Sequence, residues 1–167
     1  FFFFNSLNGD RKYNAEQLSS IFDGIITDGV FGAISGKLLV KAQSTPRMVV
    51  NVSPGRAWFN GTWTYNDTLY PVTIPESDII LDRIDTVVLE INKDDDVRAN
   101  RIFVLKGTPA TEPVAPALTK KDGVFQYPLC DILVKANATG ITQSDITNRV
   151  GTSDCPFVTG ILQTVNT

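Results

Sequence analysis

Residues 48–65, MVVNVSPGRAWFNGTWTY, predict three short strands joined by two tight turns. Asn60-Gly61 is typical of a type I′ hairpin turn, because both of its central residues need a positive φ. A two-residue loop also fixes the register of the hairpin, and it places Trp58 opposite Trp63. The two tryptophans are then expected on one face, as a non-hydrogen-bonded pair whose side chains approach closely.

The residues around the two tryptophans extend this face. Pro54-Gly55 predicts the earlier turn, in which proline presets φ and glycine accepts a positive φ. The hairpin register brings Arg56 opposite Tyr65, which predicts that the guanidinium stacks on an aromatic ring. A hairpin with paired tryptophans is typical of a hydrophobic core or a subunit interface. The alternative is a platform on which sugars stack.

The composition is that of an ordinary globular domain. Hydrophobic residues make up 43% of the 167 residues and charged residues 20%, which is enough apolar material for one sizeable core. The net charge of −3, without a basic cluster, argues against nucleic-acid binding. We expect no membrane span, because no apolar run approaches the roughly 18 residues of a spanning helix.

The sequence contains no histidine, which removes the commonest general base and the commonest zinc ligand. The two cysteines, Cys130 and Cys155, cannot complete a tetrahedral metal site, and we interpret them as separate reduced thiols. Asp82 and Asp85 flank Arg83 and form the best carboxylate pair for catalysis, but ion pairs and turn caps are the expected roles. We therefore predict that the chain is not an enzyme, with no catalytic, metal or cofactor-binding residues.

One amphipathic helix is predicted over residues 14–28. Asn14 is a good N-cap, and Gln17 three residues later completes a capping box. Gly29 is the expected C-cap. The apolar positions recur at helical spacing and form one stripe, made of Leu18, Ile21, Phe22, Ile25 and Ile26. We expect this stripe to pack on a β core, and a partner-binding helix is the alternative.

The rest of the chain predicts β structure with many turns. Strands are expected over residues 38–42, 69–74, 84–92, 101–106 and 124–135. Pro71 favours an edge strand, and Pro128 interrupts the longest one. The proline-rich residues 107–118 are expected to run extended along the outside of a sheet. Asp94, Asp95 and Asp96 indicate a solvated loop, with a cation site as the alternative.

These patterns predict a mainly β fold, an antiparallel β-sandwich-like domain with one N-terminal amphipathic helix packed on it. Residues 1–30 are expected to hold an apolar segment and the helix, and residues 31–150 the β-sandwich-like domain. Residues 151–167 are interpreted as a linker toward a distal region that is missing from this chain.

Both ends of the sequence are more apolar than free termini normally are. An uninterrupted aromatic run opens the chain, and a second apolar stretch begins at residue 157. A second copy or another protein would cover such surfaces, and closed symmetry is the usual solution. The candidate assembly interface is Phe1, Phe2, Phe3, Phe4, Phe157 and Val158.

Five segments follow one another along the chain in a recognisable order. They are NSLNGDRKYNAEQ (5–17), VSPGRAWFNGTW (52–63), LDRIDTVVLEIN (81–92), KGTPATEPVAPALT (106–119) and LCDILVKANATGITQSDITNRV (129–150). In this order and spacing they resemble the N-terminal domain of tail baseplate or receptor-binding structural proteins from phages and prophages of Gram-positive bacteria. The resemblance covers nearly the whole chain.

This resemblance implies a structural virion protein, the attachment or assembly domain of a tail baseplate or receptor-binding (tail fibre) protein that contributes to host attachment. It implies a homo-oligomer, a trimer, that contacts other tail or baseplate proteins. A host cell-surface saccharide or protein would be reached through regions outside this chain. The protein would be made in the bacterial host cytoplasm and located in the virion tail.

The residues leave one alternative function open. A carbohydrate-binding β-sandwich module would use exposed aromatic side chains as a stacking platform, and the residues for it are Trp58, Trp63, Tyr65 and Tyr70. Side-chain burial distinguishes the two functions, because a platform for sugars must be open to solvent while an interface or core residue is covered.

Overall fold

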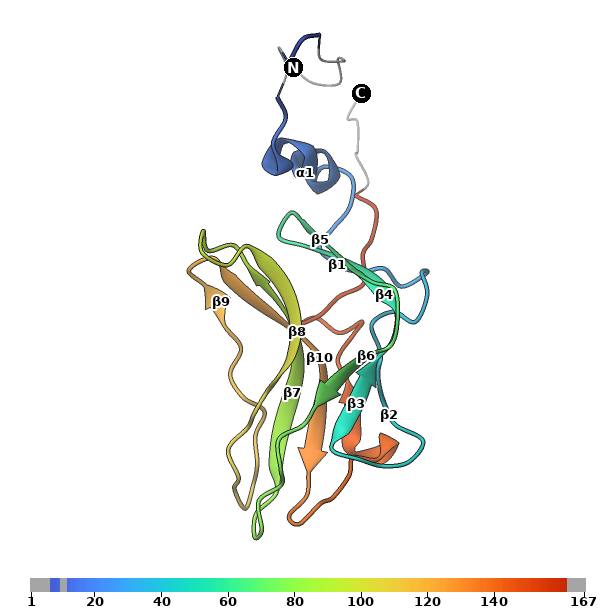
Figure 1. The fold of residues 1–167 in the computed structure, drawn as a ribbon, viewed down its shortest axis with the longest axis vertical. Helices are drawn as coiled ribbons and strands as arrows, with labels where there is room; N and C mark the ends of the chain where they lie inside the picture. The colour runs from blue at the N-terminus through green and yellow to red at the C-terminus, as the bar shows by residue number, and fades with distance from the viewer. Residues whose placement is uncertain (1–6, 10–11, 162–167) are drawn as a thin grey trace, which may run out of the picture.

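The computed structural model describes residues 7–9 and 12–161. The chain is mainly β, with 40% strand and 8% helix, which confirms the predicted fold class. Figure 1 shows an elongated molecule in which the helix α1 (Ala15–Asp23) lies at one end and the β sheets fill the rest. Every pairing between the named strands is antiparallel.

The strands form one large sheet and two small ones. The large sheet has the order β11-β10-β7-β8, with β9 also paired to β10. Its strands are β7 (Arg83–Asn92), β8 (Ala99–Leu105), β9 (Lys120–Lys121), β10 (Val124–Val134) and β11 (Ile146–Asn148). One small sheet joins β2 (Val40–Ala42), β3 (Val49–Val52) and β6 (Tyr70–Thr73). The other joins β1 (Gly29–Val30), β4 (Gly55–Phe59) and β5 (Thr62–Asn66).

All three sheets contribute to a single hydrophobic core. Alternate residues of β7, namely Val87, Leu89 and Ile91, enter this core, as expected for a strand whose side chains alternate between two faces. Val30 and Cys155 belong to the same buried cluster. The core therefore continues across the boundaries that the sequence suggested at residues 30 and 150.

Both strand prolines lie where the sequence predicted them. Pro71 is in β6, which is an edge strand of its sheet. The register of β10 against β7 shifts between Pro128 and Cys130, so the predicted interruption is a β-bulge. Residues 107–118 contain no strand and connect β8 to β9 alongside the large sheet (Figure 1).

Helix α1 begins as predicted. The Gln17 backbone N–H donates to Asn14 Oδ1 at 2.8 Å, and the Asn14 N–H donates to Gln17 Oε1 at 3.1 Å. These reciprocal bonds satisfy donors that an uncapped helix would leave without a partner. The capping box is confirmed.

The end of the helix differs from the prediction. It ends at Asp23, with Gly24 as its C-cap, so the expected extension to residue 28 and the C-cap at Gly29 are wrong. Glycine is unfavourable inside a helix. The residues that follow pair instead with the C-terminal stretch: the Thr27 N–H donates to the Thr159 carbonyl at 2.9 Å.

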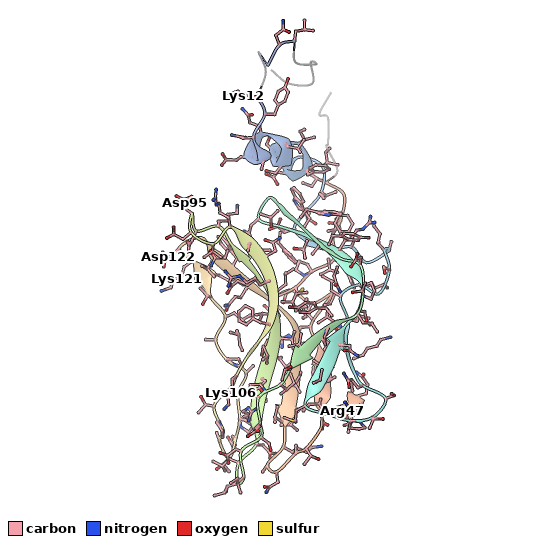
Figure 2. All side chains as sticks on the ribbon, viewed as in Figure 1. Lys12, Arg47, Asp95, Lys106, Lys121 and Asp122 are labelled. Atoms are coloured by element: carbon pink, nitrogen blue, oxygen red, sulfur yellow. The ribbon has the colours of Figure 1, made fainter. Side chains whose placement is uncertain are left out.

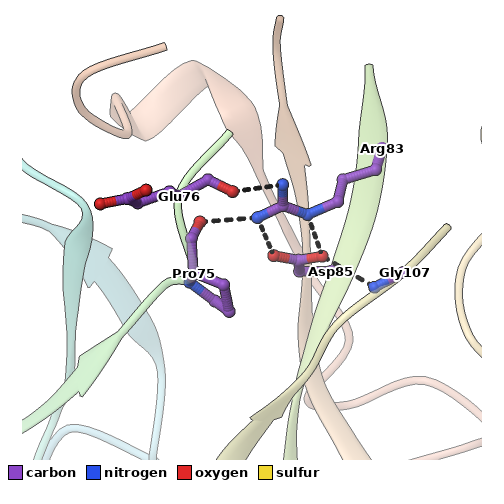
Figure 3. A network of polar contacts seen from close by, with 5 residues as sticks. All are labelled: Pro75, Glu76, Arg83, Asp85 and Gly107. Carbon is purple, nitrogen blue, oxygen red and sulfur yellow. Dashed lines mark hydrogen bonds and ion pairs between the residues drawn. The ribbon is translucent and has the colours of Figure 1, made fainter. Parts of the chain in front are cut away.

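The Arg83 side chain forms the most deeply buried polar network of the described residues (Figure 3). Its guanidinium binds both carboxylate oxygens of Asp85, at 2.8 and 3.0 Å, and both side chains are buried. It also donates to the carbonyls of Pro75 and Glu76, at 2.6 and 2.7 Å, while the Gly107 N–H donates to Asp85 at 2.8 Å. The network therefore fixes two connecting segments against β7.

The two cysteines are free and buried, which confirms the prediction of separate thiols. Burial raises the pKa of both Cys130 and Cys155 to about 12, so both are protonated at neutral pH. The thiolate is the reactive form. We expect no alkylation of the native protein at pH 7.5 and two alkylated thiols in denaturant without reductant, as measured by intact mass. Unchanged mass in denaturant would contradict the assignment.

Candidate functional site

The β4–β5 hairpin has the register that the sequence predicted. Trp58 pairs with Trp63 and Arg56 with Tyr65. Asn60 and Gly61 have φ values of 51° and 71°, as a type I′ turn requires. The Arg56 guanidinium lies 5.8 Å from the Trp63 ring and 5.1 Å from the Tyr65 ring, so the predicted stacking is confirmed.

The prediction of a positive φ at Gly55 is wrong. Gly55 is absent from the glycines with positive φ, and it begins strand β4. A Cβ atom at this position would lie 2.5 Å from the Leu38 backbone nitrogen. Gly55 is therefore required by close approach of another backbone segment, a constraint that a turn dipeptide does not reveal.

The inner face of the hairpin fixes it to the large sheet. Phe59 is 1% exposed, and its ring stacks on that of Tyr127 at 3.8 Å between centroids. The Tyr127 hydroxyl donates to Asn60 Oδ1 at 2.6 Å. Burial raises the pKa of Tyr127 to about 12, so this donor keeps its proton at physiological pH. These contacts hold the hairpin against the large sheet, while its other face lies toward α1.

An apolar groove of about 790 Å³ lies between the outer face of this hairpin and helix α1. Leu18, Phe22 and Ile25 line one side, and Trp58 and Trp63 line the other. No residue of α1 is buried. Four residues of the predicted stripe, Leu18, Phe22, Ile25 and Ile26, line this groove, whereas Ile21 does not. We call this feature the α1–hairpin groove.

The two tryptophans of the groove differ in burial. Trp58 is 5% exposed and packs against the Phe22 ring at 5.1 Å, whereas Trp63 is 49% exposed and meets the Phe31 ring edge-on at 5.4 Å. The indole Nε1 of Trp58 is buried and has no hydrogen-bond partner within residues 7–9 and 12–161. Trp58 is therefore a buried residue of the groove, and Trp63 is open to solvent.

The four residues proposed as an aromatic platform do not form one row. Trp58 and Trp63 line the α1–hairpin groove, whereas Tyr65 and Tyr70 line a separate pocket of about 510 Å³ beside β8. The tyrosines are 60% and 45% exposed. Polar groups of this tyrosine pocket come from Asn66, Glu90, Asn100 and Arg101.

The predicted assembly residues fall into two groups. Phe1, Phe2, Phe3 and Phe4 lie outside the described residues. Phe157 and Val158 pack on their own chain: the Val158 N–H donates to the Val30 carbonyl at 2.9 Å, and Phe157 bridges with Val30. A Cβ atom on Gly29 would lie 2.5 Å from the Val158 nitrogen, so the close approach depends on glycine.

The C-terminal stretch is also held by charge. Arg149 forms ion pairs with Asp131 at 3.2 Å and with Asp154. The same Asp131 accepts a hydrogen bond from the Thr86 hydroxyl at 2.6 Å. The sequence did not predict that residues 156–161 lie along residues 25–30. The two segments are joined by isolated β-bridges and single hydrogen bonds, which leave no repeating pattern of apolar residues in the sequence.

The carboxylates that the sequence singled out have structural partners or face solvent. Asp82 accepts from the Ala136 N–H at 2.8 Å, and Asp85 pairs with Arg83, as predicted. The aspartate run at 94–96 is an exposed loop beside the turn at Asp122, where Figure 2 labels Asp95, Lys121 and Asp122. Among the described residues, no group of three potential metal ligands occurs.

The helices within residues 7–9 and 12–161 are also too short or too polar to cross a membrane.

Comparisons of the chain with protein-family models, with curated proteins and with solved structures find no match.

Proposed function

We propose that this chain is a structural virion domain, which attaches and assembles a baseplate or receptor-binding protein in a phage tail. The proposal joins the motif resemblance to one structural observation. Exposed apolar side chains gather around the α1–hairpin groove at one end of the β domain, and they are Leu18, Phe22, Ile25 and Trp63. Contiguous apolar surface of this kind marks protein–protein contact sites.

Assembly also accounts for the choice of residues in the groove. Tryptophan and other aromatic residues are enriched at protein interfaces, because they bury large areas with few rotamers to fix. The groove contains Trp58, Trp63, Phe22 and Phe31 in one place. Under this proposal the β sheets position the groove, and the partners are further copies and other tail proteins.

Co-sedimentation with particles tests the proposal. Phage particles released by the encoding bacterium would be purified on a density gradient, and peptides of this chain would be quantified by mass spectrometry. We expect the chain to band with particles in a fixed ratio to the tail proteins. A chain found only in the unassembled fraction would contradict the proposal.

A carbohydrate-binding module remains the second proposal, and the tyrosine pocket is the observation that favours it. Two exposed tyrosines beside Glu90, Asn100 and Arg101 offer ring faces for stacking and polar groups for hydroxyls. Isothermal titration calorimetry with bacterial cell-wall saccharides tests this second proposal. Tyr70→Ala is the variant expected to lose binding, and Tyr13→Ala, outside the tyrosine pocket, is the control. Saturable binding that only Tyr70→Ala removes would support this module, and no heat of binding would exclude it for those saccharides.

A further inference from the structure

We propose that the α1–hairpin groove receives residues 1–4, the four consecutive phenylalanines, of a second copy of this chain. This inference rests on the proposed assembly function and names the contact through which copies associate. The groove supplies the apolar surface, and the FFFF segment supplies aromatic side chains that require such a surface.

As the described residues form it, the groove has the properties of a receptor for an apolar segment. Its volume of about 790 Å³ lies in the range of well-formed ligand pockets, roughly 300–1,000 Å³. Both walls carry aromatic rings, Phe22 on α1 and Trp63 on the hairpin, and both of these side chains are about half exposed. Among the described residues that line it, Arg56 is the one that carries a charge, so an uncharged occupant fits better than a charged one.

The FFFF segment fits this chemistry. Each phenylalanine that enters such a groove buries on the order of 150–250 Å². Offset or edge-on aromatic pairs form readily with walls of Trp and Phe. Left exposed, an uninterrupted run of four phenylalanines is an aggregation hazard.

The path of the chain favours a second copy as the source of the segment. Figure 1 shows residues 7–9 beyond α1, on the side away from the β sheets and therefore away from the groove of the same molecule. Each copy has one segment and one groove, so head-to-tail exchange can close into a symmetric ring with every groove filled.

The test uses the full chain in solution. Sedimentation velocity is measured over a range of protein concentrations for the parent, for Leu18→Glu, and for a variant in which residues 1–4 are all serine. Leu69→Glu is the matched control, because Leu69 is as exposed as Leu18 but lies outside the groove. Tryptophan emission is recorded in parallel, since the only two tryptophans of the chain line the groove.

We expect the parent to associate reversibly and to shift its tryptophan emission to the red on dissociation. Leu18→Glu and the serine variant should each weaken association by about tenfold or more. The glutamate would place a charge in an apolar contact, and the serines would remove the aromatic rings that fill the groove. Leu69→Glu should associate as the parent does. Circular dichroism of each variant confirms that the β fold is retained.

Four results would overturn the inference. A serine variant that associates like the parent would exclude the FFFF segment as the occupant. A monomeric parent whose tryptophan emission reddens in the serine variant would show that the segment fills the groove of its own chain. Association that Leu18→Glu leaves unchanged would exclude the groove. A monomeric chain that still bands with particles would overturn this inference alone, whereas an associating chain absent from particles would overturn only the proposed function.

Discussion

Replacing Asp85 by asparagine should lower the free energy of unfolding by about 3–5 kcal/mol, because removing one member of a buried ion pair leaves the other charge without a counterion. The Arg83 guanidinium would remain buried beside a neutral amide. The Gly107 N–H would also lose a charged acceptor. Asparagine has nearly the same shape as aspartate, so the variant changes charge with little change in packing. Urea unfolding followed by circular dichroism measures the loss.

Asp122→Asn is the matched control. Asp122 also lies beside a cation, Lys121 at 4.0 Å, but both side chains are almost fully exposed. Water screens such a pair, and its loss typically costs within about 0.5 kcal/mol. A loss below about 1 kcal/mol for Asp85→Asn would show that the buried pair does not fix the connecting segments.

Phe59→Ala should cost about 3–5 kcal/mol, since truncating a fully buried phenylalanine removes transfer free energy and leaves a cavity. The variant also removes the ring that stacks on Tyr127. Phe22→Ala is the matched substitution in the groove. Because Phe22 is 43% exposed, we expect it to cost only about 1–2 kcal/mol.

Chemical unfolding of both variants, at a concentration where the parent is monomeric, checks this difference. Equal losses for Phe22→Ala and Phe59→Ala would mean that α1 belongs to the core. A loss below about 1 kcal/mol for Phe59→Ala would mean that the hairpin does not depend on its stack with Tyr127.

The features that the sequence predicted well are those set by neighbouring residues. The Asn60-Gly61 turn fixed the hairpin register, and Asn14 with Gln17 fixed the start of α1. The two strand prolines were placed correctly because a missing N–H restricts where a strand can hold them. These signals are local, so a single sequence contains them.

The features that the sequence did not predict depend on contacts between distant segments. The helix ends at Asp23, since residues 25–27 pair with the C-terminal stretch, more than 130 positions away. Gly55 is required by the approach of Leu38 and not by its own φ. The division of the four aromatic residues between two sites likewise follows from how α1 and β8 approach the hairpin.

We propose that this domain is part of a phage tail, and imaging of labelled particles tests this location. Antibodies against the folded β domain, bound to purified particles, would be located by electron microscopy. We expect label at the tail tip in a symmetric arrangement, and no label on particles from a strain in which the coding sequence is deleted. Label on the capsid, or none on intact tails, would contradict it.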